Sequence, residues 1–141
     1  MNGDNNGMRI KHSLTNEDVR AIALACRVEI EKNDWNMTLA IVDEGGHPLY
    51  LERMDRARVS TVNVAIGKAK TAAFSRAPTH AMESRLKENP ALFFLDAMPM
   101  QGGLPILHEG ECVGGIGVSG GTGAQDEQVG NAGLAALKVH K

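Results

Sequence analysis

The chain has 141 residues and a mass of 15.1 kDa, which suits one domain. Its formal net charge of -2 and pI near 6.2 argue against a nucleic-acid partner. The sequence has no block of Lys and Arg residues, so a membrane-surface partner is not expected either. The N-terminus has no apolar core typical of a signal peptide, and the two cysteines lack the spacing of metal ligands. We therefore expect a cytoplasmic protein with reduced thiols.

The chain is expected to begin with a tail and a helix. Residues 1–12 are rich in Asn and Gly, which predicts a disordered tail before a single domain over residues 13–141. Thr15 and Asp18 have the spacing of a capping box, and an apolar stripe at helical spacing follows them. These signals predict a helix that runs to about Lys32.

Two strands and two helices are expected next. Residues 37–42 are apolar on both faces, which is typical of a central strand, and the tight turn at 43–46 predicts a returning strand over 47–54. Residues 60–75 form an alanine-rich helix that can pack closely against a sheet. A second short helix follows, with Thr79 as its expected N-cap.

The last third combines an apolar loop, a hairpin and a helix. Residues 87–101 carry two phenylalanines between prolines, which predicts a loop with at most a short helical turn, covering the core, a neighbouring subunit or a ligand. Strands over 104–108 and 111–119 form a hairpin, and Thr122 with Gln125 caps the final helix. The order α-β-β-α-α-β-β-α predicts an α+β fold, an antiparallel β-sheet flanked by α-helices.

The segment GGIGVSGGTGAQDEQVG joins the last strand to the last helix. It contains a Gly-x-Gly-x-x-Gly pattern, but no further strand follows to complete a dinucleotide-binding unit, and no Lys-Ser/Thr pair follows as in a P-loop. Two interpretations stay open. The glycines permit tight backbone packing, or the helix N-terminus receives an anion such as a carboxylate. The candidate ligand-binding residues here are Ser119, Gly120, Gly121, Thr122, Gln125 and Asp126.

Four ordered blocks resemble one known family. IVDEGGHPLYLERMD is similar to its Asp-x-Gly-Gly…Arg-Met-Asp signature, and AIGKAKTAAFSRAPTH to its Lys-Ala-x-Thr-Ala helix ending in Pro-Thr. GGLPI and GGIGVSGGTGAQDEQV resemble its two C-terminal blocks. The family is the GlcG/HbpS-like family, often labelled haem-degrading, which includes the C-terminal domain of propanediol-utilisation corrinoid adenosyltransferase. The chain departs from it at Arg56, where relatives often have glycine.

This resemblance implies a protein that binds haem or a related tetrapyrrole or corrinoid, as an accessory to metabolism. Imidazole is the usual axial iron ligand. His80 follows the Pro-Thr block and is the candidate iron ligand; the other interpretation is an exposed histidine in a first helical turn. The remaining histidines are His12, His47, His108 and His140. No nucleophile–base pair or paired carboxylates indicate an enzyme, so catalytic turnover is left open.

Lys68 and Arg53 are further candidate binding residues. Lys68 lies among small apolar residues, so its stem is expected to be packed and its charge needs an acceptor. Carboxylates that match the family pattern are Asp43, Asp55 and Asp126. One interpretation is an internal salt bridge. The other gives an alternative function, a binding module or accessory enzyme for a small organic acid or diol-pathway metabolite that uses the Gly-rich helix N-terminus.

The chain has more apolar residues than a single small core can bury, which predicts a homo-oligomer. Leu24 and Val28 fall outside the main stripe of the first helix, and residues 91–100 add phenylalanines and methionines. A chain this short has a limited interior, so these side chains are expected to pack against another copy. The ligand site would then lie near a subunit boundary.

Overall fold

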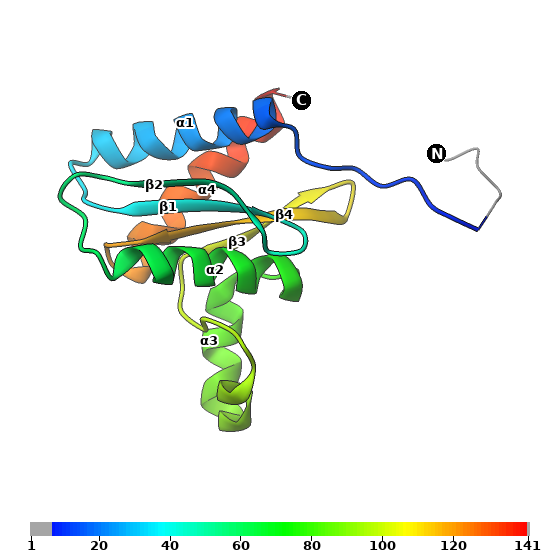
Figure 1. Cartoon of the computed structure of the whole chain (residues 1–141). Coiled ribbons are helices and arrows are strands. Elements are labelled where there is room, and N and C mark those ends of the chain that lie inside the picture. Colours follow the sequence, from blue (N-terminus) through cyan, green and yellow to red (C-terminus); the bar gives the residue numbers. More distant parts are fainter. Residues whose placement is uncertain (1–6, 141) are drawn as a thin grey trace.

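A four-stranded antiparallel sheet carries helices on both faces (Figure 1). The computed structural model describes residues 7–140, and side chains as far as Leu137. The predicted element order is confirmed, with a 3-10 turn added in the apolar loop. The elements are α1 (Asn16–Lys32), β1 (Thr38–Asp43), β2 (Pro48–Arg53), α2 (Thr61–Ser75), α3 (Thr79–Glu88), η1 (Pro90–Phe94), β3 (Gly103–His108), β4 (Glu111–Ser119) and α4 (Gly123–His140).

The predicted N-terminal tail falls only partly within the described residues. Residues 1–6 lie outside them, and residues 7–12 contain no helix or strand. This second part is nevertheless tied to the domain by ion pairs to Glu44 and Glu111. It therefore runs close to the turns at one end of the sheet.

Strand β1 is central, as its two-sided apolar pattern predicted. The sheet order is β2-β1-β4-β3, so β1 pairs with both β2 and β4. Pro48 begins β2, which is an edge strand, and its missing N–H is therefore not required for strand pairing. Leu39 and Ile41 contribute to the larger core beneath α1 and α4, whereas Ala40 and Val42 face α2. Alternate residues of one strand thus bury both faces of the sheet.

Helix α2 packs unusually close to β4 because the strand presents glycines to it. A Cβ atom at Gly117 would overlap the carbonyl oxygen of Ala65, and one at Gly115 would overlap that of Ala69. Both alanines are fully buried. The first interpretation of the Gly-rich segment, tight backbone packing, therefore holds for its strand part.

Two of the three predicted helix caps are confirmed. Thr15 and Asp18 exchange hydrogen bonds in a capping box, and Thr122 and Gln125 do the same before α4. The prediction that Thr79 caps α3 is wrong, because Pro78 occupies the cap position. The Thr79 hydroxyl is buried and instead donates to Met100 O and accepts from Gly103 N–H, which joins α3 to the segment entering β3.

Helix α3 points away from the sheet, and the loop containing η1 returns along it to β3 (Figure 1). The loop prediction is confirmed, since η1 is a single short turn. Phe93 and Phe94 are 71% and 89% exposed, so this projecting unit leaves its aromatic side chains uncovered. Within residues 7–140, none of the helices has the length and apolar character needed to cross a membrane.

We expect Gly117→Ala to lower the free energy of unfolding by about 1–3 kcal/mol, because the added methyl group forces α2 away from the sheet. Denaturant unfolding followed by circular dichroism measures this. Gly45→Ala is the control, since its added Cβ comes no closer than 3.1 Å to the exposed His47 ring, which can move aside. Equal stability of Gly117→Ala and the parent protein would contradict this packing.

Candidate functional site

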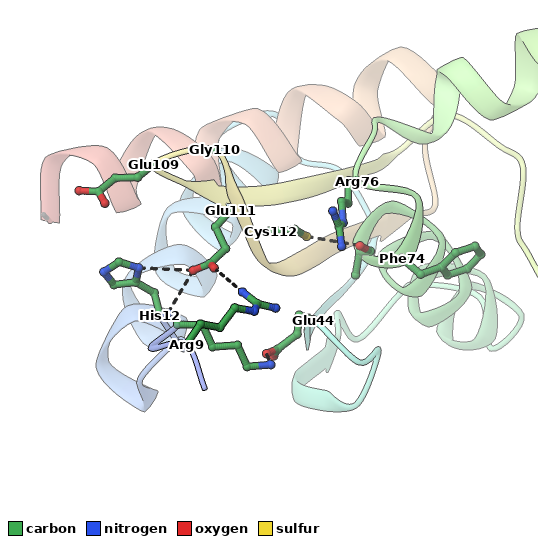
Figure 2. A pocket seen from close by; sticks show the side chains of 11 residues that line it. Arg9, His12, Glu44, Phe74, Arg76, Glu109, Gly110, Glu111 and Cys112 are labelled. Carbon is green, nitrogen blue, oxygen red and sulfur yellow. Dashed lines mark hydrogen bonds and ion pairs between the residues drawn. The ribbon is translucent and has the colours of Figure 1, made fainter. Parts of the chain in front are cut away.

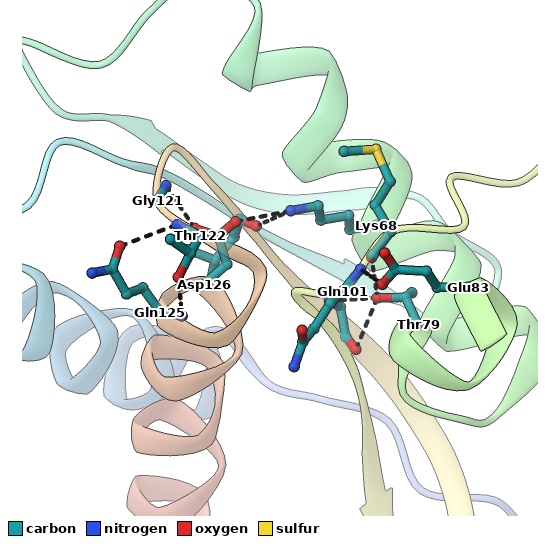
Figure 3. Close-up of polar contacts among 11 residues, drawn as sticks. Lys68, Thr79, Glu83, Gln101, Gly121, Thr122, Gln125 and Asp126 are labelled. Atoms are coloured by element: carbon teal, nitrogen blue, oxygen red, sulfur yellow. Dashed lines mark hydrogen bonds and ion pairs between the residues drawn. The ribbon is translucent and has the colours of Figure 1, made fainter.

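The turn between β4 and α4 uses its own side chains to satisfy its backbone. Gly120 has a φ of 136°, which favours glycine, and the N–H of Gly121 donates to Asp126 Oδ1 at 2.9 Å. The Thr122 N–H donates to Gln125 Oε1 at 3.1 Å. Two donors that were candidates for an external anion therefore already have partners within the chain (Figure 3).

A buried ion pair lies beside this turn. Lys68 Nζ, on α2, donates to Asp126 Oδ2 at 3.0 Å and to Val118 O at 2.9 Å, and the two charged side chains are 3% and 2% exposed. Burial raises the pKa of the Asp126 carboxyl, while Lys68 and the Gly121 N–H act in the opposite direction. Asp126 is thus the acceptor among the three proposed carboxylates, and the pair is an internal salt bridge.

A hollow of about 350 Å³ opens next to this ion pair. The lining residues that the sequence had singled out are Lys68, Ser119, Gly120, Gly121 and Asp126. Sequence reasoning missed Arg58, Glu83 and Gln101, which also line it. Gln101 is held in place because its N–H donates to Glu83 Oε2 at 3.1 Å (Figure 3). A long-range contact of this kind has no local sequence signal.

His80 lies outside that hollow, in the first turn of α3. Its Nδ1 is 2.7 Å from Glu127 Oε1 on α4, and the imidazole is half-exposed. A carboxylate at Nδ1 favours the proton there and leaves the lone pair of Nε2 available, which is the usual arrangement of a metal-binding histidine. Glu127, whose carboxylate contacts Nδ1, was not predicted from the sequence.

The remaining candidates lie elsewhere. Arg53 is exposed at the end of β2 and lines a separate hollow with Arg56 and Asp55, so the structure does not bring it together with Lys68. His47 is exposed beside Asp43, and the side chain of His140 lies outside the described ones. The predicted set therefore divides into the ion-pair hollow, the His80–Glu127 pair and the isolated Arg53.

We expect Lys68→Met to lower the free energy of unfolding by about 3–5 kcal/mol, because it leaves Asp126 buried without its cation. Lys68→Met combined with Asp126→Leu should recover most of the loss, since both charges are then removed. Urea unfolding compares the variants. The control is Lys32→Met, which removes an exposed lysine paired with Glu29 and should change stability little. Equal losses in Lys68→Met and Lys32→Met would contradict this assignment.

Comparison with known proteins gives related sequences and folds. The family model described as "Haem degrading protein HbpS-like" matches residues 14–135. Protein GlcG of Escherichia coli strain K12 is 36% identical over 114 residues, which cover 79% of this chain and 85% of the relative. Among solved structures, a double mutant of Streptomyces reticuli HbpS has a TM-score of 0.87 at 32% identity, over 97% of this chain and 95% of that chain.

A structure described as a PduOC:Heme complex has a TM-score of 0.82 at 23% identity, over 89% of this chain and 95% of that chain. At this identity the likeness shows a common fold. The family model and the GlcG and HbpS relatives go further, because they extend over most of the chain. The protein therefore belongs to the HbpS-like family.

Proposed function

We propose that the protein binds haem, or a related tetrapyrrole or corrinoid, on the unit formed by α3 and the loop after it, with His80 as the residue that would hold the metal ion. The observation that carries the proposal is the Nδ1 contact of His80 with Glu127 at 2.7 Å. Membership of a family described as haem-degrading and a fold shared with a haem complex support it. Bound haem would supply the iron chemistry that the side chains themselves lack.

Exposed apolar residues of the loop after α3 would suit such a ligand. The Met100 carbonyl is bonded to Thr79, the neighbour of His80, and the Met100 side chain is 46% exposed. Leu95 is 48% exposed in the same returning loop. These apolar groups suit the face of a macrocycle. The exposed Lys87, two helical turns after His80 and on the same face of α3, would suit a carboxylate side chain of the tetrapyrrole.

The small-acid alternative ranks below this proposal for a physical reason. It depends on the N–H groups of Gly121, Thr122 and Gly123 at the N-terminus of α4, and on Lys68 or Arg53. The N–H groups of Gly121 and Thr122 and the Lys68 ammonium group already donate to Asp126 or Gln125, and Arg53 lies in another hollow. An acid entering at this turn would have to displace hydrogen bonds that are already made, which reduces its net gain.

We expect haemin to bind the protein saturably, with a shifted Soret band, and His80→Ala to weaken binding at least about tenfold through loss of the iron ligand. Absorbance titration of the pure full chain measures both. Glu127→Gln should weaken binding as well, because the imidazole loses the carboxylate that orients it. His47→Ala is the matched control, an exposed histidine beside a carboxylate. Identical titrations of wild type and His80→Ala would reject His80 as the ligand.

We also propose that the protein is a homo-oligomer with closed symmetry, in the cytoplasm. Leu24 and Val28 lie outward on α1 at 63% and 53% exposure, and Phe93 and Phe94 lie uncovered on the projecting loop. A monomer normally exposes single, scattered apolar side chains, whereas here they are grouped at two separate places on the surface. Such groups are typical of surfaces that are buried between subunits. A partner chain that covers the loop would also shield a ligand bound at α3.

We expect light scattering during gel filtration to give a multiple of the 15.1 kDa chain mass at micromolar concentration. Leu24→Glu and Phe94→Glu place a charge on each exposed surface in turn. The variant that lowers the mass identifies the surface that is buried between chains. A single peak at 15.1 kDa for the parent protein would reject the oligomer, and with it a site shared between subunits.

A further inference from the structure

We propose that His12, His108 and Glu109 form a binding site for a divalent transition-metal ion, with Zn²⁺ as the reference ion. One ligand atom from each of the three residues lies within 4.8 Å of the other two. The site lies at the β3–β4 hairpin, and none of its residues takes part in the haem proposal. The metal-site proposal can therefore be tested independently of the haem proposal.

The hairpin and the N-terminal segment together bring these residues into one place. His108 ends β3, and Glu109 follows it in the two-residue turn with Gly110, where both have positive φ. His12 precedes His108 by 96 positions in the sequence. The centroids of the two imidazole rings nevertheless lie 4.4 Å apart, and the ring planes are inclined by 69°. Two imidazoles from distant segments thus meet beside a carboxylate that is 3.9 Å from His108 Nε2.

Glu111 holds His12 in this position. Its Oε1 accepts the backbone N–H of His12 at 3.1 Å and lies 3.4 Å from His12 Nδ1. Its Oε2 accepts from Arg9 at 3.2 Å (Figure 2). A carboxylate at Nδ1 again leaves Nε2 of His12 as the nitrogen available for a metal, so Glu111 would orient a metal ligand.

The ligand types decide which ions fit. Two imidazoles with one carboxylate suit Zn²⁺, Ni²⁺ or Co²⁺, whereas Ca²⁺ and Mg²⁺ prefer oxygen ligands alone. His12 is exposed and His108 half-buried, so an ion can reach the site. A pocket of about 690 Å³, lined by His12, Glu109 and Arg76 among others, opens beside it and leaves room for water or an anion at the remaining coordination positions (Figure 2).

Binding would have a structural consequence. The ion would join the N-terminal segment to the β3–β4 hairpin more firmly than the existing ion pairs, which are exposed and individually weak. The N-terminal segment should therefore become more resistant to protease when Zn²⁺ is added. This effect supplies a readout that is independent of any activity.

The experiment is calorimetric titration of the tag-free full chain with ZnCl₂, supported by the visible absorption of Co²⁺. We expect one ion per chain and at least about tenfold weaker binding in His12→Ala and in His108→Ala. Glu111→Gln should weaken binding about tenfold, because it removes only the carboxylate that orients the His12 imidazole and leaves all three metal ligands in place. His47→Ala is the matched control, since it removes a histidine from the other hairpin turn and should leave the affinity unchanged.

The outcomes separate clearly. Absence of binding in the wild type, or wild-type affinity in both His12→Ala and His108→Ala, overturns the proposal. Loss of binding in Cys112→Ser also overturns it, because that thiol lines the neighbouring pocket and would then be the ligand. One ion per two chains, with a mass that doubles only when Zn²⁺ is added, overturns it as well, since the ion would then bridge copies. Circular dichroism checks that each variant is folded, and haemin titration tests the His80 proposal separately.

Discussion

The salt bridge between Lys68 and Asp126 holds together the part of the molecule where α2, β4 and α4 converge. Both charges are almost fully buried, so neither can be hydrated, and each depends on the other. Asp126 also accepts the Gly121 N–H, and Lys68 also donates to Val118 O. One pair of side chains thereby links the end of β4, the start of α4 and α2.

The close approach of α2 to the sheet makes this salt bridge possible. Gly115 and Gly117 remove the side chains that would otherwise separate the helix from β4, and small buried alanines face them. The lysine stem can then lie against the sheet while its ammonium group reaches the strand end. Glycine in a strand normally weakens it, and here the loss is offset by burial of the helix.

Two successive residues of α4, Asp126 and Glu127, contact different parts of the protein. Asp126 points into the protein toward Lys68, whereas Glu127 points toward α3 and contacts His80. Neighbouring positions on a helix are about 100° apart, so one turn of α4 serves both the internal salt bridge and the exposed histidine. The orientation of His80, the proposed metal ligand, thus depends on the same helix end that the salt bridge fixes.

The sequence by itself determined the element order and the antiparallel α+β class, because periodicity and capping signals such as Thr15 with Asp18 are local. It also indicated that Lys68 needs a buried acceptor. Only the tertiary structure decided which carboxylate this is, that Thr79 is bonded to Met100 rather than serving as a cap, and that Glu127 orients His80. These contacts join residues 21 to 58 positions apart, and no local pattern encodes such partners, because they result from how the helices pack on the sheet.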